Sequence, residues 1–196
     1  MTLSAAASIT QTSRVPVVAA AAAPRWTLDA SHSHVGFAVR HLMISNVRGE
    51  FTKLEGSAAY DPARPEATTV EVKIDVASIN TREEKRDAHL RSADFFDAEK
   101  FPHIAFASTS ARPKGDGLEL IGDLTIHGVT RPVTLAVDDI TPASKDPYGN
   151  VRVGATAKTK IRRSEFGMTW NAALEAGGVL VGDEISITLE VELIRQ

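Results

Sequence analysis

The sequence predicts an all-β protein built as an antiparallel meander of strands. Apolar and polar residues alternate with a period of two in several separate segments, which is typical of strands with one buried and one exposed face. Turn-forming pairs such as Asp61-Pro62, His127-Gly128 and Gly177-Gly178 separate these segments. Strands with one apolar face must either close on themselves or pack against a second sheet. The sequence therefore predicts a closed barrel or a two-sheet sandwich.

The alternating segments can be followed from Trp26 almost to the C-terminus. In the clearest example, Val70, Val72 and Ile74 alternate with charged residues. Eight or more strands are expected in about 170 residues, at the spacing typical of all-β folds. The expected strands lie near residues 34–42, 47–60, 70–76, 103–112, 118–126, 133–137, 151–157 and 185–193.

One segment departs from the period of two and predicts a short helix near residues 82–92. Thr81-Arg82-Glu83-Glu84 matches a capping box, in which Thr81 caps the helix and Glu84 reaches back to the cap. Asp87 and Arg91 stand at the i, i+4 spacing that favours an ion pair. After the helix, Phe95, Phe96 and Phe101 form an aromatic-rich connection that we expect to pack against a strand surface.

Residues 1–24 differ in composition from the rest of the chain. They contain eight alanines, one charged residue (Arg14) and no aromatic residue. A secretory signal places positive charge first and a stronger apolar stretch next, whereas here Arg14 comes late and Pro16 interrupts the apolar run. We therefore expect a flexible tail at 1–24, a single folded domain at 25–196, and a cytoplasmic location.

Composition excludes several classes of protein. The chain has 196 residues, no cysteine and a formal net charge of −3. The absence of cysteine excludes disulfides, thiolate metal sites and thiol nucleophiles, and no cofactor is expected. The balanced charge argues against nucleic acid as a partner. No apolar run approaches the roughly 20 residues of a membrane-spanning helix.

The six histidines are the only candidates for metal ligands. His32 and His34 are two residues apart, so on a strand they would share a face and could hold a metal ion. Hydrogen bonding to nearby backbone is the favoured explanation, because no third ligand stands at a recognisable spacing. An alternative function therefore stays open, a metal-assisted hydrolase or isomerase in which His32, His34 and a further histidine converge.

Two clusters of charged residues could each have either a functional or a purely structural role. Arg86, Asp87 and His89 could form an acid–base site, but residues two apart on a helix do not face each other. Charge-assisted hydrogen bonds that pin the helix to a barrel rim are favoured for this cluster. The pair Arg162-Arg163 could hold an anionic head group, or it could be a solvated strand end.

Four stretches of the chain resemble the YceI-like, polyisoprenoid-binding proteins. They are WTLDASHSHVGFAVRHLMISNVRGEF (26–51), INTREEKRDAHLRSADFFDAEKFPHIAFAST (79–109), GDLTIHGVTRPVTL (122–135), and IRRSEFGMTW with VGDEISITLEVEL (161–170 and 181–193). The resemblance covers residues 25–196. It implies an antiparallel up-and-down eight-stranded β-barrel, lipocalin-like or streptavidin-like, with an elongated apolar channel that holds a long isoprenoid chain or a related amphiphile. Many members of the family are exported to the periplasm, so a periplasmic location is the alternative to a cytoplasmic one.

An apolar channel can bind such a chain without catalytic residues. Burial contributes about 0.8 kcal/mol per methylene-sized group, association costs roughly 4–15 kcal/mol, and a micromolar complex requires about −8 kcal/mol. Something like 15–30 buried carbon groups satisfies these figures, which is several isoprene units. The sequence therefore predicts non-catalytic binding, sequestration or transport of a polyprenyl or quinone tail. A second alternative is a side-chain-filled barrel that acts as a dimeric interaction module, and a homodimer is possible in either case.

The predicted site combines inward-facing strand positions with the aromatic connection. The residues expected to line the channel are Phe37, Val39, Phe51, Ile74, Leu90, Phe95, Phe96, Phe106, Leu124, Ile126, Phe166, Met168 and Trp170. The residues expected at a polar mouth or rim are His32, His41, Arg86 and His89.

Overall fold

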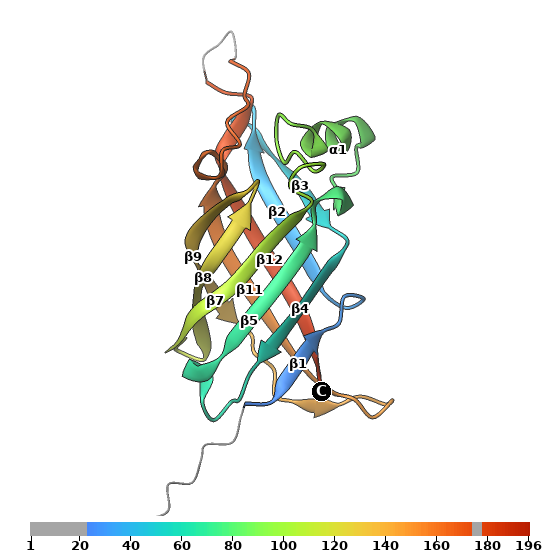
Figure 1. The fold of residues 1–196 in the computed structure, drawn as a ribbon, viewed down its shortest axis with the longest axis vertical. Coiled ribbons are helices and arrows are strands. Elements are labelled where there is room, and N and C mark those ends of the chain that lie inside the picture. Colours follow the sequence, from blue (N-terminus) through green and yellow to red (C-terminus); the bar gives the residue numbers. More distant parts are fainter. Residues whose placement is uncertain (1–22, 174–177) are drawn as a thin grey trace, which may run out of the picture.

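The alternating segments form a closed antiparallel β-barrel, with one short helix at one end (Figure 1). The computed structural model describes residues 23–173 and 178–196. Most of the tail predicted at 1–24, and with it the question of a signal segment, lies outside the described residues. In the described part, no helix has the length and apolar character that crossing a membrane requires.

Within residues 23–173 and 178–196, twelve strands, one α-helix and three short 3₁₀ helices follow one another. The strands are β1 (Arg25–Leu28), β2 (His34–His41), β3 (Ser45–Phe51), β4 (Leu54–Ala59), β5 (Thr69–Asp75), β6 (Ile79–Asn80), β7 (His103–Lys114), β8 (Gly117–Ile126), β9 (Val129–Asp138), β10 (Ser144–Lys145), β11 (Val151–Arg162) and β12 (Val181–Arg195). The helices are η1 (Pro65–Ala67), η2 (Val76–Ser78), α1 (Glu84–Arg91) and η3 (Arg163–Phe166).

The barrel wall has eight positions, and chain neighbours pair in sequence order around it. Three positions are filled by two short strands each, namely β1 with β2, β3 with β4, and β5 with β6. The other five are β7, β8, β9, β11 and β12. The predicted eight-stranded up-and-down barrel is confirmed, and the two-sheet sandwich is not what forms.

The last strand closes the barrel. One edge of β12 pairs with β11 from Arg152↔Ile194 to Arg162↔Glu184. Its other edge pairs with β2 and then, near the C-terminus, with β1. Closure removes the exposed edges that an open sheet would leave.

A partly buried ion cluster joins three distant segments at the end of the barrel where β1 starts. Arg152 donates to Asp29 at 2.6 Å, to Asp146 at 2.7 Å and to Glu192 at 2.5 Å. The Arg152 side chain is only 19% exposed, and those of Asp29 and Asp146 are 12% and 11% exposed. The Arg152 guanidinium holds the pKa values of Asp29 and Asp146 far below their ordinary range. The cluster fixes the β1–β2 connection and the β10–β11 turn onto β12.

Replacing Arg152 should change how stability depends on pH. A carboxyl group whose pKa is lowered by folding stabilises the protein above its unfolded pKa of about 3.9, and this contribution disappears as the pH falls through the folded pKa. We expect Arg152→Met to be less stable than the parent at pH 7, with the gap in the free energy of unfolding shrinking steadily below about pH 4. Urea unfolding between pH 2 and 7 measures this, with Arg112→Met, an exposed arginine of β7, as control. A gap that does not change with pH would contradict the assignment.

Candidate functional site

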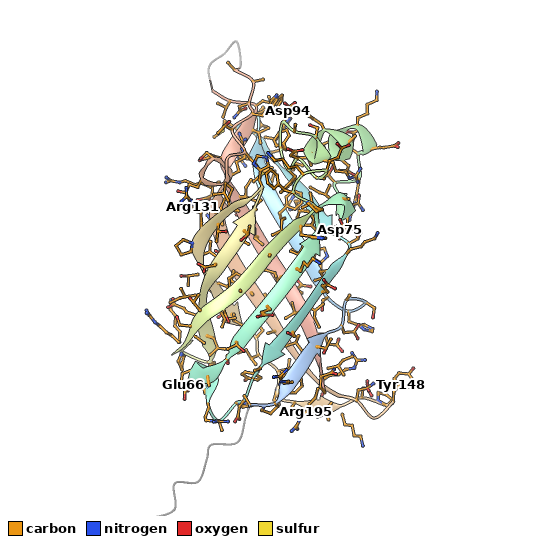
Figure 2. All side chains as sticks on the ribbon, viewed as in Figure 1. Glu66, Asp75, Asp94, Arg131, Tyr148 and Arg195 are labelled. Carbon is orange, nitrogen blue, oxygen red and sulfur yellow. The ribbon has the colours of Figure 1, made fainter. Side chains whose placement is uncertain are left out.

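An elongated apolar cavity lies inside the barrel. Its volume is about 240 Å³. At one end its wall contains Tyr60 and Thr68, next to η1; at the other it contains Leu90 of α1, Phe96 and Met168. In Figure 2 the labels of Glu66 and Asp94 mark these two ends.

The strands aim their apolar residues into this cavity by simple alternation. In β8, Leu118, Leu120 and Leu124 are buried and line the cavity, while Glu119, Ile121 and Asp123 on the other face are more exposed. In β12, Ile185, Ile187 and Leu189 are partly buried and also line the cavity. Each strand thus contributes every second side chain to a wall made of aliphatic groups.

Two glycines in the wall make room for aromatic rings. The Phe106 ring lies over Gly122, with a ring carbon 2.5 Å from where a Cβ would stand. The Phe37 ring lies in the same way over Gly49, at 2.4 Å. Any side chain at either glycine would displace the ring from its place along the wall, so the two glycines determine where aromatic surface lies.

Most of the predicted lining residues stand on the cavity wall. Phe37, Phe51 and Phe96 form a continuous aromatic surface, with ring centroids 5.7 Å and 5.9 Å apart. The predicted residues found on the wall are Phe37, Val39, Phe51, Ile74, Leu90, Phe95, Phe96, Phe106, Leu124, Ile126 and Met168. Their contact with a ligand remains a prediction.

Phe166 and Trp170 are not among the residues that line the cavity. Phe166 belongs to η3, where the strand alternation ends, and its side chain is buried in the core at 1% exposure. Trp170 follows η3 and packs against Phe95 at 5.2 Å and His89 at 4.8 Å between ring centroids. Extending the period of two beyond Arg162 placed both residues wrongly, because the backbone turns there.

The four residues predicted for a polar rim do not form one group. Arg86 and His89 lie on α1, and His41 ends β2, beside Val181. His32 instead follows β1 and pairs with Asp29 of the ion cluster, at 2.9 Å. That cluster lies at the opposite end of the barrel from α1 (Figure 1). A single mouth with all four residues is therefore wrong.

Helix α1 is held on the barrel by a buried polar cluster around Thr81. The Thr81 hydroxyl donates to Asp87 at 2.5 Å and accepts from Arg86 Nε at 2.7 Å. The Thr81 N–H also donates to Asp87, at 2.9 Å. Arg91 donates to the carbonyl oxygens of Ala77 and Ile79, both at 2.9 Å. These bonds pin α1 beside β6, so Leu90 is held on the cavity wall.

The expected capping box is wrong, and so is the expected use of Asp87. The helix is capped by Glu83, whose carboxylate accepts from the N–H groups of Lys85 and Arg86. Thr81 bonds to Asp87 instead, and Arg91 bonds to backbone carbonyls rather than to Asp87. Burial beside the barrel gives Thr81 stronger partners than the helix terminus offers, which local sequence spacing does not show.

Arg163 is neither a binding site for an anionic head group nor a solvated strand end, the two roles considered for the pair Arg162-Arg163. It is 5% exposed, and burial lowers its pKa. Its N–H groups donate to the carbonyl oxygens of Met168, Trp170, Val181 and Gly182. Arg163 is therefore committed to joining the segment after η3 to the start of β12, and Met168 is held on the cavity wall as a result.

The histidines do not converge on a metal site in the described residues, which include all six. His34 pairs with Glu50 at 3.1 Å and His89 with Asp94 at 2.8 Å. Asp29, His32 and Glu192 are the only described group with ligand spacing, and Arg152 already occupies its two carboxylates. The geometry predicted by the hydrolase or isomerase alternative is therefore not found.

These features define the class of protein: a closed up-and-down β-barrel with an internal apolar cavity and a helix held over one end. The model of the YceI-like domain family matches residues 26–193. The chain belongs to the YceI-like family.

Relatives support the same assignment. The chain is 37% identical over 168 residues to the protein YceI of Escherichia coli O157:H7, an alignment that covers 86% of this chain and 84% of that protein. The crystal structure of the Campylobacter jejuni YCEI protein superposes with a TM-score of 0.68 at 32% identity, covering 80% of this chain and 89% of the other. A polyisoprenoid binding domain from Saccharophagus degradans shares the fold, with a TM-score of 0.62 at 14% identity and coverage of 87% and 98%.

Sequence reasoning missed Tyr60, Thr68 and Arg163 as wall residues. The signal for Thr68 was present, because it lies two residues before Val70 on the inward-facing register of β5. Arg163 gave no such signal, since a charged residue at a strand end is most often solvated.

Removing the Thr81 hydroxyl should weaken the attachment of α1. Thr81→Val keeps the shape of the side chain but takes one hydrogen bond from buried Asp87 and one from Arg86. We expect a loss of about 2–3 kcal/mol in the free energy of unfolding, because bonds to charged groups are the stronger kind. Urea unfolding measures the loss, and hydrogen exchange should show faster exchange in α1. Thr125→Val, which removes an exposed hydroxyl paired with Thr130, is the control and should change little. Equal losses in the two variants would contradict this role for Thr81.

Proposed function

We propose that this protein binds a long-chain isoprenoid or related amphiphile inside its barrel and sequesters or carries it without catalysis. The observation that carries the proposal is the elongated cavity, whose wall is almost entirely aliphatic and aromatic. Such a wall offers contact area but few hydrogen bonds, which suits a polyprenyl or quinone tail.

The size of the cavity supports a chain of this kind. The cavity of about 240 Å³ runs from the η1 end of the barrel to α1, which gives an extended apolar chain a continuous apolar wall to lie along. The structurally similar Saccharophagus degradans protein is described as a polyisoprenoid binding domain, which supports the same ligand class. A barrel that acts only as an interaction module was expected to have an interior filled by side chains, whereas this barrel contains a cavity. Dimerisation remains a prediction.

The helix end offers an entry route for the ligand. There the wall is completed by Leu90, Phe95 and Phe96, and α1 is held by hydrogen bonds to Thr81, Ala77 and Ile79, with Leu90 as its apolar contact to the core. Polar contacts can exchange with water when the helix lifts, whereas the barrel strands stay paired. At the η1 end, Trp26 is buried at 3% exposure and donates to the Tyr60 carbonyl, which closes that end.

Filling the cavity should abolish lipid binding without unfolding the protein. Ala157 of β11 lies on the cavity wall, so the larger side chain of Ala157→Leu would occupy ligand space. We expect native mass spectrometry after purification to show bound lipid in the parent and at least about tenfold less in the variant, a difference of about 1.4 kcal/mol. Its stability should fall by less than the roughly 1–3 kcal/mol typical of overpacking, because the added carbons enter a cavity.

The matched control makes the same change on the outer face. Ala136 of β9 is exposed and does not line the cavity. Ala136→Leu should retain lipid at the parental level. Organic extraction of the parent identifies the ligand class. A parent that neither copurifies with lipid nor binds added isoprenoids would overturn the proposed function.

A further inference from the structure

One polar side chain on the cavity wall has no hydrogen-bond partner among the described residues. Thr68, which follows η1, is 6% exposed and lines the cavity. Its Oγ1 is the only buried side-chain nitrogen or oxygen atom in the described part of the chain without a partner. A buried hydroxyl without a hydrogen bond is unfavourable, and buried polar side chains nearly always have one. Valine would fill the same space without this penalty, so the presence of a hydroxyl points to a hydrogen-bond partner outside the protein.

The other polar groups on the wall differ from Thr68. Thr159 donates to the Thr134 carbonyl at 2.9 Å. The N–H groups of Arg163 donate to backbone carbonyls. Ser57 is exposed. Among buried wall residues in the described ranges, Thr68 alone has hydrogen-bonding capacity that the protein leaves unused.

The hydroxyl can reach the cavity without movement of the backbone. Thr68 precedes Val70 and Val72 on the same inward-facing register, and all three line the cavity. Threonine populates staggered χ1 rotamers, and a rotation of about 120° moves Oγ1 to another of the three staggered positions on Cβ. A ligand atom at this end of the cavity can therefore accept from or donate to the hydroxyl.

The surroundings of Thr68 favour a neutral partner. No charged side chain lines the cavity at this end within the described residues; Arg163, the charged residue on the wall, belongs to the η3 region. A buried anion here would have no counter-charge, which is strongly unfavourable. Burial and the neighbouring Asp61 also raise the pKa of Tyr60, which shows that negative charge is disfavoured at this end.

We propose that Thr68 binds a neutral oxygen atom, a hydroxyl or a carbonyl, at the buried end of the ligand. The cavity then selects an oxygen-bearing isoprenoid over a hydrocarbon of the same length. The rest of the chain lies along the apolar wall toward α1. This inference rests on the proposed function and specifies the ligand class for the same cavity.

Paired ligands test the proposal. Delipidated full-length protein is titrated with geranylgeraniol, a C20 isoprenoid alcohol, and with the corresponding C20 hydrocarbon, and the bound ligand is quantified by native mass spectrometry. We expect Thr68→Val to weaken alcohol binding about fivefold or more, the factor that one net hydrogen bond represents. Hydrocarbon binding should stay the same or become slightly tighter, because the variant buries no unpaired hydroxyl.

Two further variants serve as controls. Thr68→Ser keeps the hydroxyl and should bind the alcohol as the parent does. Thr159→Val removes the other wall threonine hydroxyl, which already has a protein partner, and should affect both ligands equally. Since Thr68 Oγ1 makes no bond to the protein, Thr68→Val should have an unchanged or raised Tm, so impaired folding does not confuse the result.

The outcomes separate this inference from the proposed function. Selective loss of alcohol binding in Thr68→Val supports it. An equal effect on the two ligands, or no effect on either, overturns the role of Thr68 and leaves the apolar cavity as the binding site. If the parent binds neither ligand, the proposed function fails and the inference fails with it.

Discussion

The rest of the structure depends on the pairing of β12 with both β11 and the β1–β2 wall position. This strand joins the last part of the chain to the first and turns an open meander into a closed barrel. Closure satisfies the backbone hydrogen bonds that an edge strand would leave unpaired. It also converts one face of every strand into an interior, so the alternating apolar residues surround a single enclosed space.

The two ends of that space are stabilised by different chemistry. At the β1 end, Trp26 packs with Ala58 and Val153 in a small apolar cluster, and Arg152 ties three segments together through its carboxylate partners. At the other end, α1 is held by hydrogen bonds around Thr81, and Arg163 holds the segment after η3 through backbone carbonyls. Because ion pairs and hydrogen bonds hold the two ends of the barrel, its apolar interior can admit an apolar chain while the strands of the wall stay paired.

The middle of the barrel combines aliphatic side chains with a few aromatic rings set over glycines. This arrangement leaves space because the strands supply Val, Leu, Ile and Ala rather than large rings at most inward positions. Recognition of a flexible hydrocarbon chain depends on buried area, which such a wall provides. An unpaired hydroxyl at Thr68 adds one directional contact to this otherwise non-directional surface.

Alternation along the chain was enough to predict the strands and which of their residues face the interior, because a period of two assigns each residue to one face regardless of its partners. The choice of a closed barrel over a two-sheet sandwich came from the resemblance to the YceI-like family. Alternation failed at Phe166 and Trp170, where the strand ends. The tertiary structure alone decided the partners of Thr81, the burial of Arg163 and the separation of His32 from α1. Those outcomes depend on contacts between segments that closure of the barrel brings together, and local spacing carries no information about such contacts.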